Sequence, residues 1–143
     1  MIIPSLRVHS WIALAIAATA PACIPAHHVA AIQTEARAEG LARVSVREVD
    51  DNIFKFSVLN LSKEILVVDR DAVRLVTPRG SRERAPGGVA HTYTIQPGGA
   101  HDLNVKFDLE GLGEGTEVSI SFTDAILVGG KPVPLDPIRY RLD

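Results

Sequence analysis

The sequence contains a single cysteine, a single tryptophan and no marked excess of charge of either sign. A chain with one cysteine cannot form an internal disulfide, so its fold must be stabilised by the burial of side chains. The 15 basic and 17 acidic residues nearly balance, and such a surface has no general attraction for nucleic acid. At 143 residues the chain has room for one domain and not for two. These absences exclude a disulfide scaffold and a basic protein that binds nucleic acid.

Long hydrophobic runs are also missing. The apolar stretch at residues 11–20 has ten residues, about half of the ~20 that a helix needs to cross a bilayer. It follows a segment that carries Arg7 and no acidic residue, and it precedes the small-x-small sequence Ala20-Pro21-Ala22. A positive segment, a short apolar run and a small-x-small site together are typical of an export signal. We therefore predict that residues 1–22 form a signal peptide, cleaved after Ala22.

Cleavage after Ala22 makes Cys23 the first residue of the mature chain. The end of this signal resembles the lipobox of bacterial lipoproteins, in which a small residue is followed by cysteine. The resemblance implies a lipid group, with acyl chains such as palmitate, on the Cys23 sulfur. It also implies a place in the cell envelope, anchored in the outer membrane and facing the periplasm or the surface; several acyl chains anchor a protein durably. The alternative is ordinary secretion through the same small-x-small site, which gives a soluble periplasmic or secreted protein.

Residues 23–40 are predicted to form a flexible linker between this cysteine and a folded domain. Pro25 and several alanines leave the segment with few apolar side chains to bury. The adjacent pair His27-His28 has no further ligands nearby, so we interpret it as solvated and not as a metal site. At 3.3–3.6 Å per residue, the 17 residues from 24 to 40 would reach at most about 60 Å.

Beyond residue 40, apolar and polar residues alternate with a period of two, which is the pattern of strands with one buried face. Turn residues separate these strands, among them Asp50-Asp51-Asn52 and Gln96-Pro97-Gly98-Gly99, whose Pro-Gly pair predicts a type II turn. The pattern predicts an all-β fold in which residues 41–143 form a single immunoglobulin-like (Greek-key) β-sandwich of about seven or eight strands. The expected strands cover residues 42–47, 54–59, 65–68, 73–77, 92–95, 102–109, 118–128 and 138–143.

The layout from Phe54 to Leu142 resembles the immunoglobulin-like sandwich domains of bacterial envelope lipoproteins. Three segments carry the resemblance: residues 56–60, the turn at 95–99 and the strand at 102–109. The chain lacks the cysteine pair and the core tryptophan of antibody-type domains. The resemblance therefore implies an architecture and an envelope setting, and it does not identify a ligand, because many functions occur on this fold.

No catalytic residues and no cofactor are predicted. Ser119 and Ser121 occupy strand positions without the glycine elbow that surrounds a nucleophilic serine. His91 and His101 flank one expected strand, but too few further ligands accompany them to hold a metal. The triplet at residues 69–71 is interpreted as turn capping, because it lacks the spaced ligands of a calcium loop.

Residues 77–88 are predicted to form a mobile surface loop, because glycine and proline recur along the segment. This loop carries three arginines, Arg79, Arg82 and Arg84. Arginine binds carboxylates and phosphates through paired hydrogen bonds. We therefore interpret these three residues as the best candidates for contact with an anionic group or a partner.

Three classes of function remain open at the level of sequence. The first is a non-catalytic envelope lipoprotein whose β-sandwich acts as a protein-interaction or assembly module. The second is an exported domain that binds a small ligand or a glycan, in which Tyr93 and Tyr140 would have to supply any stacking on sugar rings. The third, a metal-dependent enzyme, requires at least three converging ligands, and the sequence does not indicate them.

Overall fold

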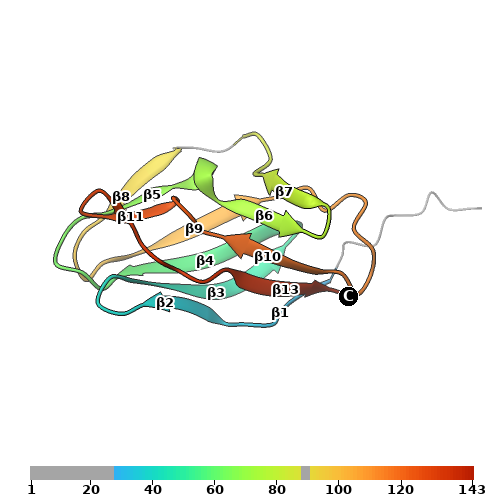
Figure 1. The fold of residues 1–143 in the computed structure, drawn as a ribbon, viewed down its shortest axis with the longest axis horizontal. Coiled ribbons are helices and arrows are strands. Elements are labelled where there is room, and N and C mark those ends of the chain that lie inside the picture. Colours follow the sequence, from blue (N-terminus) through green and yellow to red (C-terminus); the bar gives the residue numbers. More distant parts are fainter. Residues whose placement is uncertain (1–27, 88–90) are drawn as a thin grey trace, which may run out of the picture.

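The structure is a computed structural model that describes residues 28–87 and 91–143. Within those residues the chain forms 13 β-strands and one short 3-10 helix, packed as two layers (Figure 1). The predicted all-β sandwich is confirmed. The elements are β1 Val29–Ala31, β2 Glu35–Ala38, β3 Ala42–Asp50, β4 Ile53–Asn60, β5 Leu66–Asp69, η1 Arg70–Ala72, β6 Arg74–Thr77, β7 Gly80–Glu83, β8 Thr92–Ile95, β9 Ala100–Lys106, β10 Glu117–Ser121, β11 Ile126–Val128, β12 Lys131–Pro132 and β13 Ile138–Leu142.

One layer of the sandwich is a single hydrogen-bonded sheet, and the other layer is divided into two sheets. One layer is a single sheet with the strand order β2-β3-β4-β9, and the other consists of two sheets laid end to end, β1-β13-β10-β6-β7 and β12-β11-β5-β8 (Figure 1). The chain runs from one of these two sheets into the other between β5 and β6, between β10 and β11 and between β12 and β13. Between β10 and β11 lies Asp124, whose φ of 61° ends an extended course. The strand predicted over residues 118–128 therefore appears as the two strands β10 and β11. This division, together with the unpredicted strands β1, β2, β7 and β12, raises the strand number above the expected seven or eight.

Aromatic side chains join the two layers at the centre of the core. Phe54 of β4 meets Tyr140 of β13 with ring centroids 5.0 Å apart, and Phe56 of β4 meets Phe122 at 5.3 Å. Both pairs have the edge-to-face arrangement that the charge distribution of aromatic rings favours. All four residues are at most 1% exposed. The alternating apolar residues of the sequence thus form one shared core.

Two turns take the conformations that their residues predict. Asp51 and Asn52, between β3 and β4, have φ values of 47° and 64°, the pair of positive angles that a two-residue type I′ hairpin requires. In the turn after β8, Gly98 has a φ of 74°, and Gly99 N donates to Gln96 O at 2.9 Å, as in a type II turn. The predicted type II turn is confirmed. At Asp51-Asn52 the sequence predicts a turn, and its type I′ conformation is a finding of the structure.

The prediction of a linker over residues 23–40 is wrong for residues 29–38, which contain β1 and β2. β1 pairs with β13 in one layer and β2 pairs with β3 in the other, so this segment crosses between the layers. Ala36 and Ala38 are its buried side chains, and alanine adds so little to a hydrophobic pattern that the alternation is easily missed. Cys23 and the predicted signal peptide lie outside the described residues. Among the described residues, no helix has the length and apolar character to cross a membrane.

The prediction of a loop over residues 77–88 is wrong for residues 80–83. Gly80–Glu83 is strand β7, which pairs with β6 around the turn at Pro78 and Arg79. The hydrophobic pattern does not reveal this strand, because none of its four residues is buried. Residues 88–90 lie outside the described part of the chain.

Tyr140→Phe is expected to raise the free energy of unfolding by about 1 kcal/mol. Tyr140 Oη is buried and has no hydrogen-bond partner among the described residues, and burial raises the pKa of this hydroxyl. An unpaired buried hydroxyl destabilises the fold, and phenylalanine would remove it while keeping the ring against Phe54. Urea denaturation measures the change.

Tyr93→Phe is the matched control for this prediction. Tyr93 Oη donates to Asp102 O at 3.1 Å, so the same chemical deletion should here lower the free energy of unfolding by about 1 kcal/mol. A loss of stability in Tyr140→Phe comparable to that in Tyr93→Phe would contradict the expectation.

Candidate interaction surfaces

The three arginines predicted for partner or anion contact do not form one binding site in the described structure. Arg82 Nη1 donates to Asp108 O at 2.8 Å and to Glu110 O at 3.0 Å. Arg84 is held by other groups of the fold, and Arg79 lies in the turn between β6 and β7. Two of the three guanidinium groups therefore have internal partners.

Of the three arginines, Arg82 contributes to a row of hydrogen bonds that covers the edge of β9 and the residues just after it. This strand is the last in its sheet, and its register with β4 turns the backbone groups of residues 102, 104 and 106 away from that neighbour. A protein edge strand with unpaired backbone groups invites pairing with another chain. Here the other layer supplies the donors: Tyr93 Oη to Asp102 O at 3.1 Å, Arg70 Nη2 to Asn104 O, Ala85 N to Lys106 O at 2.8 Å, and Arg82 Nη1 to Asp108 O at 2.8 Å.

Asp71, Arg84 and His91 form a polar cluster above this edge. Arg84 Nε lies 2.5 Å from Asp71 Oδ1. His91 Nδ1 lies 2.9 Å from Asp71 Oδ2 and 3.0 Å from Arg84 Nη2. The hydrogen bond from Arg84 and its positive charge hold the pKa of Asp71 below the ordinary value of a carboxyl group. Since the folded pKa is the lower one, this pair stabilises the fold at neutral pH, and the contribution is lost as the pH falls through the folded pKa.

Two clefts flank residues 84–87, and their linings differ in charge. The larger, of about 380 Å³, is lined by acidic and basic groups together: Asp71, Arg74, Glu83, Arg84, Pro86, Gly87 and His91. The smaller, of about 280 Å³, is lined by three basic residues and no acidic one: Ile53, Arg70, Arg84, Ala85, Pro86, Gly87, Asn104 and Lys106. We call the smaller one the basic cleft.

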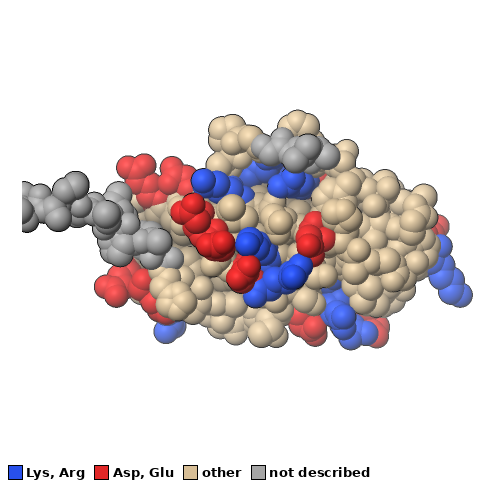
Figure 2. Space-filling model, turned by 180° about the vertical axis from the view of Figure 1, so that it is seen from behind, with Lys and Arg blue, Asp and Glu red and all other residues tan. Residues whose placement is uncertain are grey.

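Elsewhere on the same side of the molecule, charges of opposite sign are paired. Figure 2 shows blue and red side chains next to one another across the middle of this face. Arg47 lies 2.6 Å from Asp102, and Lys55 lies 3.1 Å from Glu48. Ion pairs as exposed as these contribute little to stability, and they leave little net charge on the face of the β2-β3-β4-β9 sheet.

An apolar row crosses the outer face of the β12-β11-β5-β8 sheet. Val67 is the cross-strand partner of both Thr94 and Leu127, and Leu127 is in turn the partner of Pro132. The residues on either side of Val67 and Leu127 are buried in the core, so these two side chains point outward. Ile65, just before β5, is 49% exposed. We call Ile65, Val67, Leu127 and Pro132 the apolar row, which is bordered by Thr94 of β8.

The apolar row lies at the end of the sandwich away from both ends of the described chain. In Figure 1 the sheet that carries it lies at the left, while the C-terminus and β1 lie at the right. At the right-hand end, Asp143 N donates to His28 O at 2.7 Å, which fixes the first and the last described residues side by side. Both ends of the described chain therefore lie at one end of the sandwich, and the apolar row lies at the opposite end.

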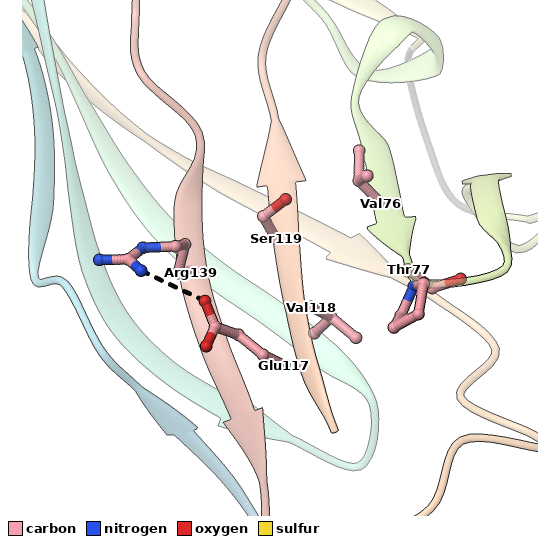
Figure 3. A pocket seen from close by; sticks show the side chains of 7 residues that line it. Val76, Thr77, Glu117, Val118, Ser119 and Arg139 are labelled. Carbon is pink, nitrogen blue, oxygen red and sulfur yellow. Dashed lines mark hydrogen bonds and ion pairs between the residues drawn. The ribbon is translucent and has the colours of Figure 1, made fainter. Parts of the chain in front are cut away.

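The outer face of the β1-β13-β10-β6-β7 sheet combines charged and polar residues with Val76, which is 40% exposed. A shallow hollow of about 280 Å³ on this face is lined by Val76, Thr77, Pro78, Glu117, Val118, Ser119 and Arg139. Figure 3 shows the side chains of Glu117 and Arg139 directed toward one another, and the two lie 3.3 Å apart. They neutralise each other, so the hollow has no net charge.

The structure separates the two histidines that flank Tyr93. β8 pairs with β5 and β9 pairs with β4, so the strands beside His91 and His101 belong to different layers. His101 instead packs on the ring of Tyr93, with ring centroids 4.6 Å apart. In residues 28–87 and 91–143 no three histidine, cysteine or acidic side chains lie close enough to hold a metal ion.

Two further interpretations can be compared with the structure. Asp69 accepts a hydrogen bond from Asp71 N at 3.0 Å at the start of η1, so within the triplet at residues 69–71 the side chain of Asp69 caps a turn, as predicted. Tyr140 is fully buried, so its ring has no face for a sugar. Of the two aromatic residues considered for glycan stacking, only Tyr93 is partly exposed.

Comparisons with known proteins add no relative. A scan against protein-family models matches no family, and searches of curated proteins and of solved structures find no similar chain. The function is therefore argued from the surfaces described above.

Proposed function

We propose that this protein is a non-catalytic lipoprotein of the bacterial cell envelope, anchored through Cys23, whose β-sandwich binds a partner protein. The observation that carries the proposal is the apolar row on the outer face of the β12-β11-β5-β8 sheet. Exposed apolar side chains that adjoin one another mark interaction sites more often than isolated ones do. In this row the partly exposed Val67 and Leu127 and the exposed Pro132 are cross-strand neighbours, and the exposed Ile65 lies two positions before Val67.

The positions of β1 and β13 indicate which end of the sandwich would face the membrane if Cys23 carries a lipid anchor. Only four residues, or five steps along the chain, separate Cys23 from His28, whose carbonyl accepts a hydrogen bond from Asp143 N. At 3.3–3.6 Å per residue, that interval reaches at most about 18 Å. A lipid on Cys23 would thus hold the end with residue 28 close to the membrane, and the apolar row would point away from it toward a partner.

The edges of the sandwich favour contact through this face. The edge of β9 is covered by donors from the opposite layer. At an edge of the sheet that carries the apolar row, β12 contains Pro132, which has no N–H to give to another strand. Packing of side chains against the apolar row does not require an open edge. A partner with an apolar surface would remove these side chains from water, and that burial favours association.

Two measurements test this function. Cys23→Ser is expected to move the protein from the membrane fraction to the soluble fraction, because the residue that would carry the acyl chains is gone. A photo-crosslinking side chain in place of Leu127 should then yield a discrete adduct in intact cells, and Leu127→Glu should abolish capture of that same partner. Ser119 lies on the outer face of the other sheet, and Ser119→Glu is the control expected to leave capture unchanged.

Either half of the proposal can fail separately. Unchanged membrane partitioning of Cys23→Ser would remove the lipid anchor. Equal crosslinking from positions 119 and 127, or partner capture that survives Leu127→Glu, would remove the apolar row as the binding surface.

A further inference from the structure

The basic cleft collects three positive charges from three separate segments. Arg70 comes from η1, Arg84 follows β7 and Lys106 ends β9. These segments meet only because the two layers of the sandwich close on one another beside β9. The lining contains no acidic side chain, whereas the neighbouring cleft, which shares Arg84, contains Asp71 and Glu83. The difference in charge is therefore specific to one cleft and not general to this side of the molecule.

Both arginines of the cleft are held in place by the fold. Arg70 donates to Asn104 O, and Arg84 is fixed by Asp71 at 2.5 Å and by Gly87 O at 2.7 Å. The side chain of Arg84 is only 9% exposed. Side chains that are already ordered lose little conformational freedom when a ligand binds, so less of the interaction energy is cancelled.

Lys106 supplies the adjustable charge. It is exposed at the end of β9, and it forms no ion pair with any residue in 28–87 or 91–143. A lysine has three donors on a flexible stem and can follow a ligand as a point charge. The cleft thus combines fixed planar cations with one mobile ammonium group.

We propose that the basic cleft is a binding site for a phosphate group, held by Arg70, Arg84 and Lys106. Arginine and lysine are the side chains that bind phosphate oxygens through charge-assisted hydrogen bonds. Asp71 compensates Arg84, and the lining still keeps an excess of positive charge that suits an anion with nearly two negative charges. The volume of about 280 Å³ accommodates a phosphate group with a small substituent.

A phosphate group can reach this cleft from two sources, a free phosphomonoester or the headgroup of an anionic lipid. The site lies at the edge of β9 and is separate from the apolar row, so it goes beyond partner binding. Neither source depends on an acyl chain at Cys23.

Calorimetric titration of the full exported chain with inorganic phosphate tests the site. Saturable binding with a stoichiometry of one is expected, and Lys106→Gln should weaken it about tenfold, because one charge-assisted contact is lost. Lys63→Gln is the matched control: it removes the same charge from an exposed residue outside the cleft lining, so phosphate affinity should be unchanged. Arg70→Gln should weaken binding as well, and thermal melts of each variant confirm that it is folded.

Sedimentation with vesicles distinguishes the sources of the phosphate. Retention on phosphatidylglycerol vesicles but not on phosphatidylcholine vesicles, lost in Lys106→Gln, assigns the site to a lipid headgroup. Phosphate binding without vesicle retention assigns it to a free phosphomonoester. Absence of both interactions, or equal weakening by Lys63→Gln and Lys106→Gln, overturns the proposal and leaves the partner-binding function untouched.

Discussion

Asn60→Ala is expected to lower the free energy of unfolding by about 3 kcal/mol. Asn60 is fully buried at the end of β4. Its Nδ2 donates to Glu64 O at 2.7 Å and to Ile95 O at 3.0 Å, and its Oδ1 accepts from Ser62 N at 2.9 Å and from Ser62 Oγ at 2.7 Å. Truncation to alanine removes the hydrogen-bond partner of the Glu64 and Ile95 carbonyls and of the Ser62 N–H and hydroxyl. Each buried polar group that loses its partner lowers the free energy of unfolding.

Urea denaturation measures this effect, and Gln96→Ala is the matched control because Gln96 is exposed. A loss below about 1 kcal/mol for Asn60→Ala, or an equal loss in both variants, would contradict the structural role of Asn60. Asn60-Leu61-Ser62 also has the letters of a glycosylation sequon. Because the amide nitrogen of Asn60 is buried and donates two hydrogen bonds, the folded chain cannot be modified there.

Phe54→Ala is expected to destabilise the fold by about 4 kcal/mol. The ring of Phe54 meets Phe107 at 5.8 Å and Tyr140 at 5.0 Å, both edge to face. Removing it loses the apolar burial of a whole side chain, leaves a cavity between the layers and ends both aromatic contacts. Chemical denaturation monitored by circular dichroism gives the change.

Phe54→Leu provides the graded comparison for this prediction. Leucine fills most of the space, so the expected loss is about 1.5 kcal/mol. If Phe54→Ala and Phe54→Leu prove equally destabilising, a cavity cannot be the cause. A loss under about 2 kcal/mol for Phe54→Ala would show that the layers repack around the site.

The alternating strands could be predicted because their causes are local. A strand with one buried face must alternate, and Leu103, Val105 and Phe107 alternate in the sequence and are all 0% exposed. The type I′ turn at Asp51-Asn52 and the type II turn at Pro97-Gly98 depend on the backbone preferences of those residues alone.

Strands β1, β2 and β7 could not be predicted from the same pattern. β2 buries only Ala36 and Ala38, β7 buries nothing, and β1 is partly exposed along its length. These strands exist because a neighbouring strand supplies hydrogen bonds, and a neighbour is not visible in a hydrophobic pattern. The expected linker is shorter for this reason, and the expected loop at residues 77–88 contains a strand.

The three arginines at positions 79, 82 and 84 also show what the sequence predicts about the candidate sites and what depends on contacts between distant residues. Their sequence predicts an exposed loop with three available guanidinium groups. The structure places Arg82 beside Asp108, 26 positions further along the chain, and attaches Arg84 to Asp71. The basic cleft contains only Arg84 of the predicted three and adds Arg70 and Lys106 from other elements.

The sequence alone therefore determined the all-β class, the principal strands and the type II turn at Pro97-Gly98, since each depends on neighbouring residues or on the period of two. It also carries the pattern from which we predict an export signal over residues 1–22, directly before Cys23. The tertiary structure alone decided the order of the strands, the closure of the β9 edge, the burial of Asn60 and the composition of the basic cleft. Each of these depends on contacts between residues far apart in the chain, and such contacts form only when the two layers pack together.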